Sequence, residues 1–149
     1  MRTTPLLLAA ALLAWPAAAA GPALHVTGWA RPTVPGQISG AAYLAIHNAG
    51  PGSDRLLALA TPAAASASVH QTSTVGGVSR MRPAGPLVVR AGQAATMSPG
   101  GLHVMLMGLK GPLRPGASLP LTLRFERAGT VRTSLPIQMS APDAGHAHH

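Results

Sequence analysis

Glycine and proline interrupt this chain at short intervals, and their spacing excludes long regular elements. The 149 residues include 17 Gly and 15 Pro. After the first 20 residues, no window sustains the i, i+3, i+4 apolar pattern of an amphipathic helix. The segments between the breakers are short apolar or alternating runs, which are typical of an all-β sandwich or barrel.

We predict nine strands from these runs. They are Leu24–Ala30, Ala41–Asn48, Leu56–Thr61, Ala67–Thr72, Val78–Arg82, Leu87–Arg90, Leu102–Leu109, Leu119–Glu126 and Thr130–Ile137. The last two are joined through a Gly-containing loop at 127–129 and are expected to form a hairpin. The Ala-rich stretch 61–68 also fits a helical turn, which stays open as an alternative there.

The first 20 residues have the pattern of a cleaved secretory signal peptide. Arg2 supplies the positive charge, residues 6–15 form a short apolar stretch, and residues 18–20 are small alanines at a cleavage site. A membrane anchor is the alternative, but the apolar run is shorter than the roughly 20 residues that span a bilayer. Pro16 also ends the run. We therefore predict export, followed by removal of residues 1–20 and no stable membrane insertion.

The rest of the chain is predicted to form one domain and a short tail. Residues 21–140 are long enough to bury a core of their own. Residues 141–149 are rich in His and have few apolar side chains. Such a segment cannot bury enough surface to order itself, so we expect this tail to be disordered.

The absence of cysteine limits the chemistry of any metal site. With no Cys in the sequence, we expect no disulfide, no thiolate ligand and no lipid attached through cysteine. A blue-copper electron carrier is excluded, because its centre needs a Cys thiolate. A metal site must therefore use His, Met, backbone groups or the three acidic residues.

The formal charge of +8 indicates a basic protein. Such a charge can steer a protein toward an acidic partner or anionic lipid, although solubility is the simpler interpretation. The basic residues are scattered, and Trp29 with Tyr43 offers at most one aromatic pair, so no nucleic-acid partner is expected. No Ser/His/Asp set or carboxylate pair stands out, and the chain is not expected to be an enzyme.

Four residues have a spacing that indicates a soft metal site. His70, Met81, His103 and Met105 read as His, ten residues, Met, twenty-one residues, His, one residue, Met. Imidazole binds several transition metals, whereas a thioether selects Cu(I) over harder ions. Alternation along a strand places His103 and Met105 on one face. His70 and Met81 flank the break at 76–77, on two strands that can be neighbours. We therefore predict a Cu(I) site formed by these four side chains.

A second metal site is suggested at the C-terminus. Its candidate ligands are Met139, His146, His148 and His149. Segments rich in His bind divalent metals, so this site could take Cu(II). A solvated tail with incidental histidines is the alternative. Met107 is interpreted as core filler, and His25 and His47 are assigned no role.

The four-residue spacing resembles that of bacterial periplasmic copper chaperones of the PCu(A)C type. The similarity extends from about residue 24 to 138 and includes Gly40–Leu44 before Asn48–Gly50, Met81–Pro83, Pro99–Leu109 and Leu119–Glu126. The resemblance implies a cupredoxin-like Greek-key β-sandwich. It also implies a periplasmic protein that binds one Cu(I) through two His and two Met and hands copper toward the copper centres of cytochrome c oxidase. Gln71 stands where many relatives place an acidic residue or Met.

The resemblance also implies the kind of partner. A copper-receiving protein is expected, such as a cytochrome c oxidase subunit or an Sco-type assembly factor, and the chain is expected to act as a monomer. Two other functions stay open. One is a periplasmic copper buffer for tolerance without a specific recipient, and the other is a β-sandwich binding module that uses no metal.

Overall fold

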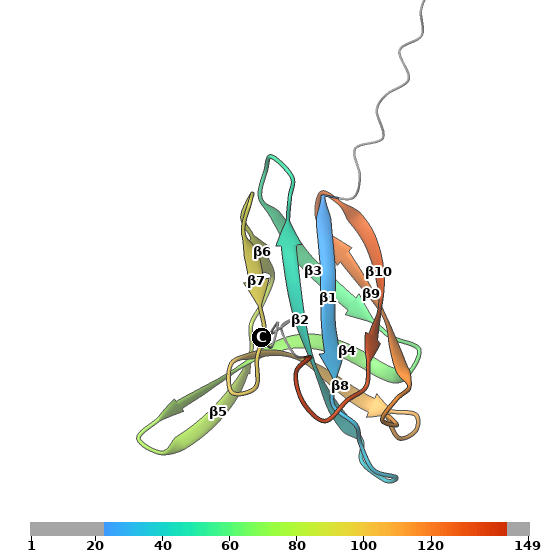
Figure 1. Cartoon of the computed structure of the whole chain (residues 1–149). Helices are drawn as coiled ribbons and strands as arrows, with labels where there is room; N and C mark the ends of the chain where they lie inside the picture. Colours follow the sequence, from blue (N-terminus) through green and yellow to red (C-terminus); the bar gives the residue numbers. More distant parts are fainter. Residues whose placement is uncertain (1–22, 143–149) are drawn as a thin grey trace, which may run out of the picture.

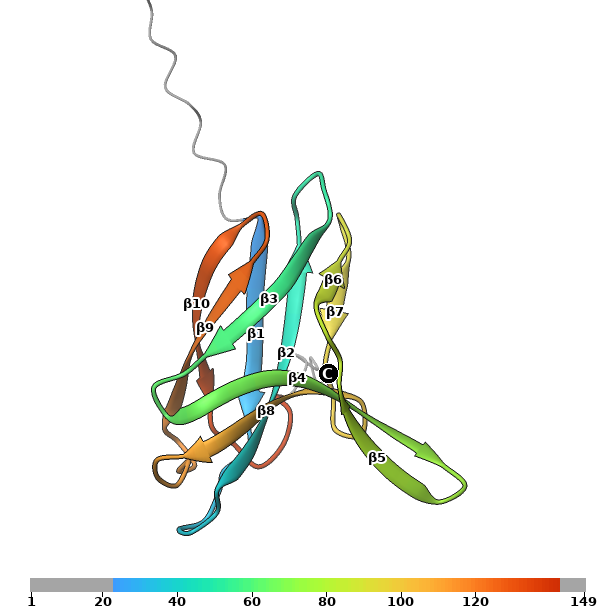
Figure 2. The same cartoon turned by 180° about the vertical axis from the view of Figure 1, so that it is seen from behind.

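Ten β-strands form the part of the chain that the structure describes, which is residues 23–142 of a computed structural model (Figures 1 and 2). The strands are β1 (Leu24–Ala30), β2 (Ser39–Asn48), β3 (Asp54–Ala60), β4 (Ala64–Val75), β5 (Val78–Pro83), β6 (Leu87–Val89), β7 (Ala94–Thr96), β8 (Leu102–Leu109), β9 (Ser118–Phe125) and β10 (Gly129–Pro136). Among these described residues, no helix is long and apolar enough to cross a membrane. The predicted signal peptide and residues 143–149 of the predicted tail lie outside them.

The strands form one sheet that curls until its two edges nearly meet. The order across it is β1-β2-β8-β4-β3-β9-β10, and a parallel bridge between Ala30 and Ile137 links the two outer strands. Strand β5 pairs with β4, β6 with β3 and β7 with β2. Pairs of strands that are distant in sequence, such as β2 with β8, require the crossing connections of a Greek key. The all-β sandwich predicted from the sequence is confirmed.

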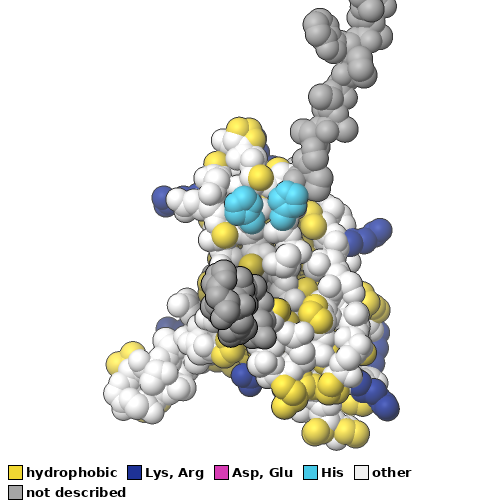
Figure 3. Space-filling view, in the orientation of Figure 1, with side chains coloured by type: hydrophobic (Ala, Val, Ile, Leu, Met, Phe, Trp, Pro, Cys, Tyr) yellow, Lys and Arg dark blue, Asp and Glu magenta, His cyan; other side chains and the backbone are white. Residues whose placement is uncertain are grey.

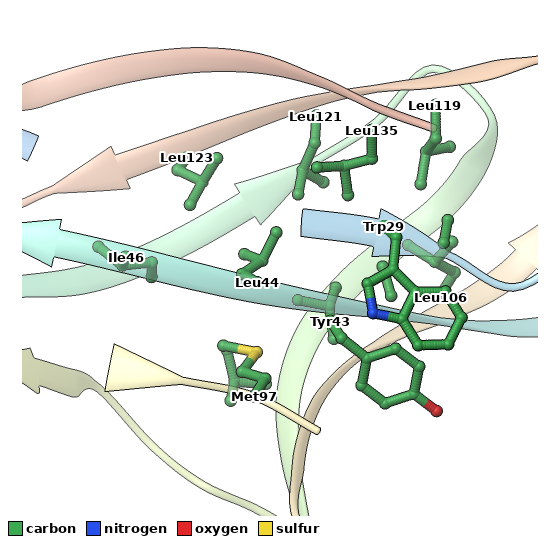
Figure 4. Packing of buried hydrophobic residues seen from close by; sticks show 14 of the residues in the cluster. Trp29, Tyr43, Leu44, Ile46, Met97, Leu106, Leu119, Leu121, Leu123 and Leu135 are labelled. Atoms are coloured by element: carbon green, nitrogen blue, oxygen red, sulfur yellow. The ribbon is translucent and has the colours of Figure 1, made fainter. Parts of the chain in front are cut away.

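Most of the core lies inside this curled sheet, on one face of each long strand (Figure 4). In β9, Leu119, Leu121 and Leu123 are buried on one face, as their alternation predicts. They belong to one cluster with Leu44, Ile46, Leu106 and Leu135 from other strands. Burial of such a side chain is worth about 1.5–3 kcal/mol. Because the inner faces hold this core, the outer faces are free to carry a binding site.

Two details of the predicted strands need correction. Strand β4 begins at Ala64, so the helical turn left open for residues 61–68 is wrong. Ala64 and Ser66 pair with Leu109 and Met107 of β8, and these long-range pairings override the helix preference of alanine. Strand β7 is absent from the prediction, because its three residues are too few to show an alternating pattern.

A buried carboxylate ties the start of β3 to the turn between β9 and β10. Asp54 accepts hydrogen bonds from the backbone N–H groups of Arg55 (2.8 Å), Arg127 (2.9 Å) and Ala128 (2.8 Å). Burial alone raises the pKa of Asp54, but these three donors and the Arg127 charge outweigh it and hold the pKa below its usual value. The ionised carboxylate therefore stabilises the fold.

We expect Asp54→Asn to lower the free energy of unfolding by about 2 kcal/mol at pH 7, because backbone N–H groups lose a charged acceptor. A lowered pKa in the folded state means that the contribution is present above the ordinary Asp pKa of about 3.9 and is lost as pH falls through the folded value. Urea unfolding of both proteins from pH 7 to pH 3 measures this. A difference between wild type and variant that stays constant over that range would contradict the assignment.

Glu126→Gln serves as the control for this prediction. Glu126 makes an ion pair with Arg55 at 3.0 Å, and both side chains are about half exposed. Exposed ion pairs contribute little to stability, so this variant should unfold like the wild type at pH 7.

Candidate metal site

The pairing of β4 with β8 brings the two predicted histidine ligands together. His70 lies directly opposite His103 in the antiparallel register. The two rings stack, with their centroids 6.2 Å apart and their planes inclined by 29°. Directly opposed side chains in an antiparallel pair lie on the same face of the sheet. The two imidazoles can therefore act on one ligand.

The hairpin of β4 and β5 places Met81 on this same face. Met81 lies opposite Thr72, and Thr72 shares a face with His70 because the two are two positions apart in the strand. The hairpin turns at Gly76 and Gly77, whose φ angles are +59° and +77°. Two positive φ angles are the signature of a tight turn that sets the register of a hairpin. In Figure 1 this hairpin projects from the body of the domain as an arm.

The alternation of β8 separates the site from the core. Val104 and Leu106 are fully buried, whereas Met105 between them lies on the outer face with His103. Met107 follows on the same outer face and is 40% exposed. Its interpretation as core filler is therefore wrong, because the inner face of β8 is already filled by its two aliphatic neighbours.

A hollow of about 280 Å³ opens beside these side chains. Its lining includes three of the four predicted ligands, Met81, His103 and Met105. The remaining lining residues are Arg31, Thr33, Gln37, Ser39, Gly40, Ala41 and Tyr43. His70 is not in the lining and lies beside the hollow, stacked on the ring of His103. The predicted quartet is thus brought to one place, and its role as a ligand set stays a prediction.

Two residues that line this hollow, Arg31 and Tyr43, were not predicted as site residues from the sequence. The ring of Tyr43 packs on Trp29 with centroids 4.8 Å apart, and the guanidinium of Arg31 lies 5.9 Å from the Tyr43 centroid. A cation over an aromatic face is held by the ring quadrupole. Tyr43 falls in a segment similar to the PCu(A)C type, which is the one signal that marked it. Arg31 comes close only through the pairing of β1 with β2.

Hydrogen bonds orient both imidazoles. His103 is only 7% exposed, and its Nδ1–H donates to the carbonyl of Gly101 at 3.2 Å. In a neutral ring this leaves the Nε2 lone pair available to a metal, which is a common arrangement around metal-binding histidines. The Nε2 of His70 instead lies 2.9 Å from the hydroxyl of Ser68. A metal that used this nitrogen would have to replace that hydrogen bond.

The remaining candidates lie apart from this cluster. Gln71 follows His70 directly and so lies on the other face of β4, where it cannot add a ligand to this cluster. Met139 is 77% exposed after the end of β10. The tail residues His146, His148 and His149 lie outside the described residues, so a second site there stays a prediction.

Residues 23–142 contain no group of three His, Asp or Glu side chains that could hold a metal. A site in this part of the chain that uses three or more His, Asp, Glu or Met side chains must therefore include methionine. Thioether donors favour soft ions over hard ones. The geometry thus suits a soft monovalent metal better than zinc, calcium or magnesium.

Comparison with known proteins places nearly all of the described domain in one family. The family model described as "Putative lipoprotein LpqE-like" matches residues 25–137. The chain is 35% identical over 99 residues to "Putative lipoprotein Lxx21020" from Leifsonia xyli subsp. xyli, a match that covers 66% of this chain and 60% of that relative. The match thus spans less than two thirds of the relative's length.

The fold is also similar to solved structures. For the apo PCuAC domain from PmoF1 the identity is 30% and the TM-score 0.66, covering 79% of this chain and 95% of that one. For CuI-DR1885 from Deinococcus radiodurans the identity is 31% and the TM-score 0.64, covering 83% of each chain. The cupredoxin-like fold and the PCu(A)C resemblance predicted from the sequence are confirmed. The chain belongs to the LpqE-like family and has the fold of PCuAC domains.

Proposed function

We propose that this chain is an exported copper chaperone that binds one Cu(I) ion through His70, Met81, His103 and Met105. The proposal rests on the register of β5, β4 and β8, which brings all four side chains to one outer face of the sheet. A relative with 31% identity has been solved as CuI-DR1885, whose name states that it holds Cu(I). Membership of a lipoprotein family agrees with export.

The donor set favours the cuprous state. Thioethers are soft and neutral, so they stabilise Cu(I) more than Cu(II). Arg31 places a fixed positive charge on the lining of the hollow, and its repulsion of a divalent ion is twice that of a monovalent one. In an oxidising compartment a thiolate site would be exposed to oxidation. A His/Met site avoids that reaction and still holds copper.

Release of the metal would begin at Met81. This side chain is 48% exposed and lies on the projecting β4–β5 hairpin, whereas His103 is almost completely buried. An incoming ligand can reach the exposed donor first and replace it, while the buried donor still holds the ion. Cysteine thiolates of a receiving protein bind soft metals well. The proposed recipient is a cytochrome c oxidase subunit or an Sco-type assembly factor.

The other face of the same hairpin offers a contact for an acidic recipient. Arg80 and Arg82 alternate with Met81 along β5, so they lie on the face opposite the thioether. In residues 23–142, the two carboxylates are engaged elsewhere, Asp54 with backbone donors and Glu126 with Arg55. The arginine charges are therefore free to attract acidic groups on a partner and to speed its association.

A transfer assay tests the proposed function. We expect the Cu(I)-loaded protein to metallate the soluble copper domain of an oxidase subunit faster than a small-molecule buffer set to the same free Cu(I). The double variant Arg80→Gln with Arg82→Gln should slow transfer about tenfold at low salt and much less at high salt, because exposed charges are screened. Val75→Ser, at the exposed tip of the same hairpin, controls for general disturbance of the hairpin. Transfer no faster than from the buffer would favour the alternative of a copper buffer.

A further inference from the structure

A second pair of histidines lies far from the site described above. His25 of β1 is directly opposite His47 of β2, and the ring centroids are 6.5 Å apart with planes inclined by 31°. Both side chains are exposed. Figure 3 shows two imidazoles side by side on the surface of this face of the molecule. The pair is thus presented to solvent without any need for the chain to rearrange.

Within the described part of the chain, no hydrogen bond occupies the ring nitrogens of this pair. Among residues 23–142, the histidine nitrogens that make hydrogen bonds belong to His70 and His103, not to this pair. On its other side His47 is paired with Ala94 of β7, and Ala45 lies two residues before it on the same face. These small side chains leave room for the imidazoles to turn toward a common ion and for water to complete its coordination.

The pair cannot share an ion with the first site. Along β2, Ala41 is opposite Met105 and His47 is opposite His25. These two positions on β2 are six residues apart, which is about 20 Å in an extended strand. Between them the face is occupied by the Trp29–Tyr43 pair. Any metal bound by the two histidines would therefore be a separate ion with separate chemistry.

We propose that His25 and His47 form a surface site for a divalent transition metal, with Cu(II) bound most tightly. Two neutral imidazoles from opposed strands and two or more waters suit the tetragonal geometry of Cu(II), which also leads the series of divalent ions in affinity for nitrogen donors. The site contains no thioether, so it does not favour Cu(I). The chain would then carry a site for each copper oxidation state on the same face of its sheet.

Paramagnetic NMR tests this proposal on the full-length mature chain, with His146, His148 and His149 replaced by Ala to silence the tail. With one equivalent of Cu(II) added, we expect amide signals to broaden at the start of β1, the end of β2 and in β7. His25→Ala and His47→Ala should each abolish this broadening and weaken Cu(II) binding at least tenfold. Thr27→Ala, on the same strand and face as His25, should change neither. Ni(II) and Zn(II) should compete more weakly than Cu(II).

Two outcomes would overturn the proposal. One is broadening that is centred on His70 and His103 and is absent from the ends of β1 and β2. The other is broadening near His25 that persists in His47→Ala, which would indicate a ligand other than the pair, such as the mature N-terminal amine. Both histidines are exposed, so the variants should fold, and their spectra without metal check this directly.

Discussion

His103→Ala is expected to weaken Cu(I) binding at least 100-fold, about 2.7 kcal/mol. His103 is the most buried of the four proposed ligands, and its Nδ1–H bond to Gly101 directs Nε2 away from the backbone. No other described imidazole can replace it, since the partner ring of His70 is already counted among the ligands. Anaerobic titration against a chromophoric Cu(I) chelator measures the affinity of variant and wild type.

Two methionines of β8 offer a matched pair for the same experiment. Met105→Leu should weaken Cu(I) binding about tenfold, because leucine keeps the volume and removes the soft donor. Met107→Leu makes the same chemical change two residues along the same face. Met107 is outside the lining of the hollow, so this variant should bind Cu(I) like the wild type. Equal losses in the two variants would contradict the proposed ligand set, and a wild type that binds no Cu(I) would favour a module that uses no metal.

Gly28→Ala is expected to lower the free energy of unfolding by about 3 kcal/mol through overpacking. Gly28 lies in the middle of β1, opposite Leu44 of β2. A Cβ at this position would lie within 3.1 Å of both Cα and Cδ2 of Leu44, and still closer to the backbone oxygen of Tyr43. A backbone oxygen cannot turn away as a side chain can, so the two strands would have to separate.

Gly111→Ala is the control for this substitution. Nothing lies within 4 Å of a Cβ at Gly111, and its φ angle is not positive. We expect its free energy of unfolding to differ from the wild type by less than about 0.5 kcal/mol. Chemical denaturation of the three proteins measures both effects. A Gly28→Ala protein as stable as the control would show that β1 and β2 tolerate a wider spacing.

The strands were largely predictable because their signals are local. Alternation of Leu119, Leu121 and Leu123 marks a half-buried strand without knowledge of its partners. The bounds predicted for Leu24–Ala30 and Leu102–Leu109 agree with β1 and β8. The local signal fails in the Ala-rich segment that opens β4. There the alanines favour a helix, and the pairing with β8 makes the segment a strand.

The site was predictable in part, for a different reason. His103 and Met105 share a face through the period of a single strand, so the sequence is sufficient to pair them. The prediction that Met107 belongs to the core was wrong, because the sequence of one strand does not show which of its two faces packs on the core. Arg31 and Tyr43 carry no chemical signature of metal binding. They line the hollow because β1 pairs with β2, and the sequence of either strand alone does not show that pairing.

The sequence by itself determined an all-β chain without thiols, and it determined which soft donors could bind a metal. Only the tertiary structure decided that His70 is opposite His103, that Met81 reaches their face from a projecting hairpin, and that His25 and His47 form a second pair. The physical reason is that composition and alternation are properties of a single strand. Register, in contrast, is set by turns and by burial across strands that are distant in the chain.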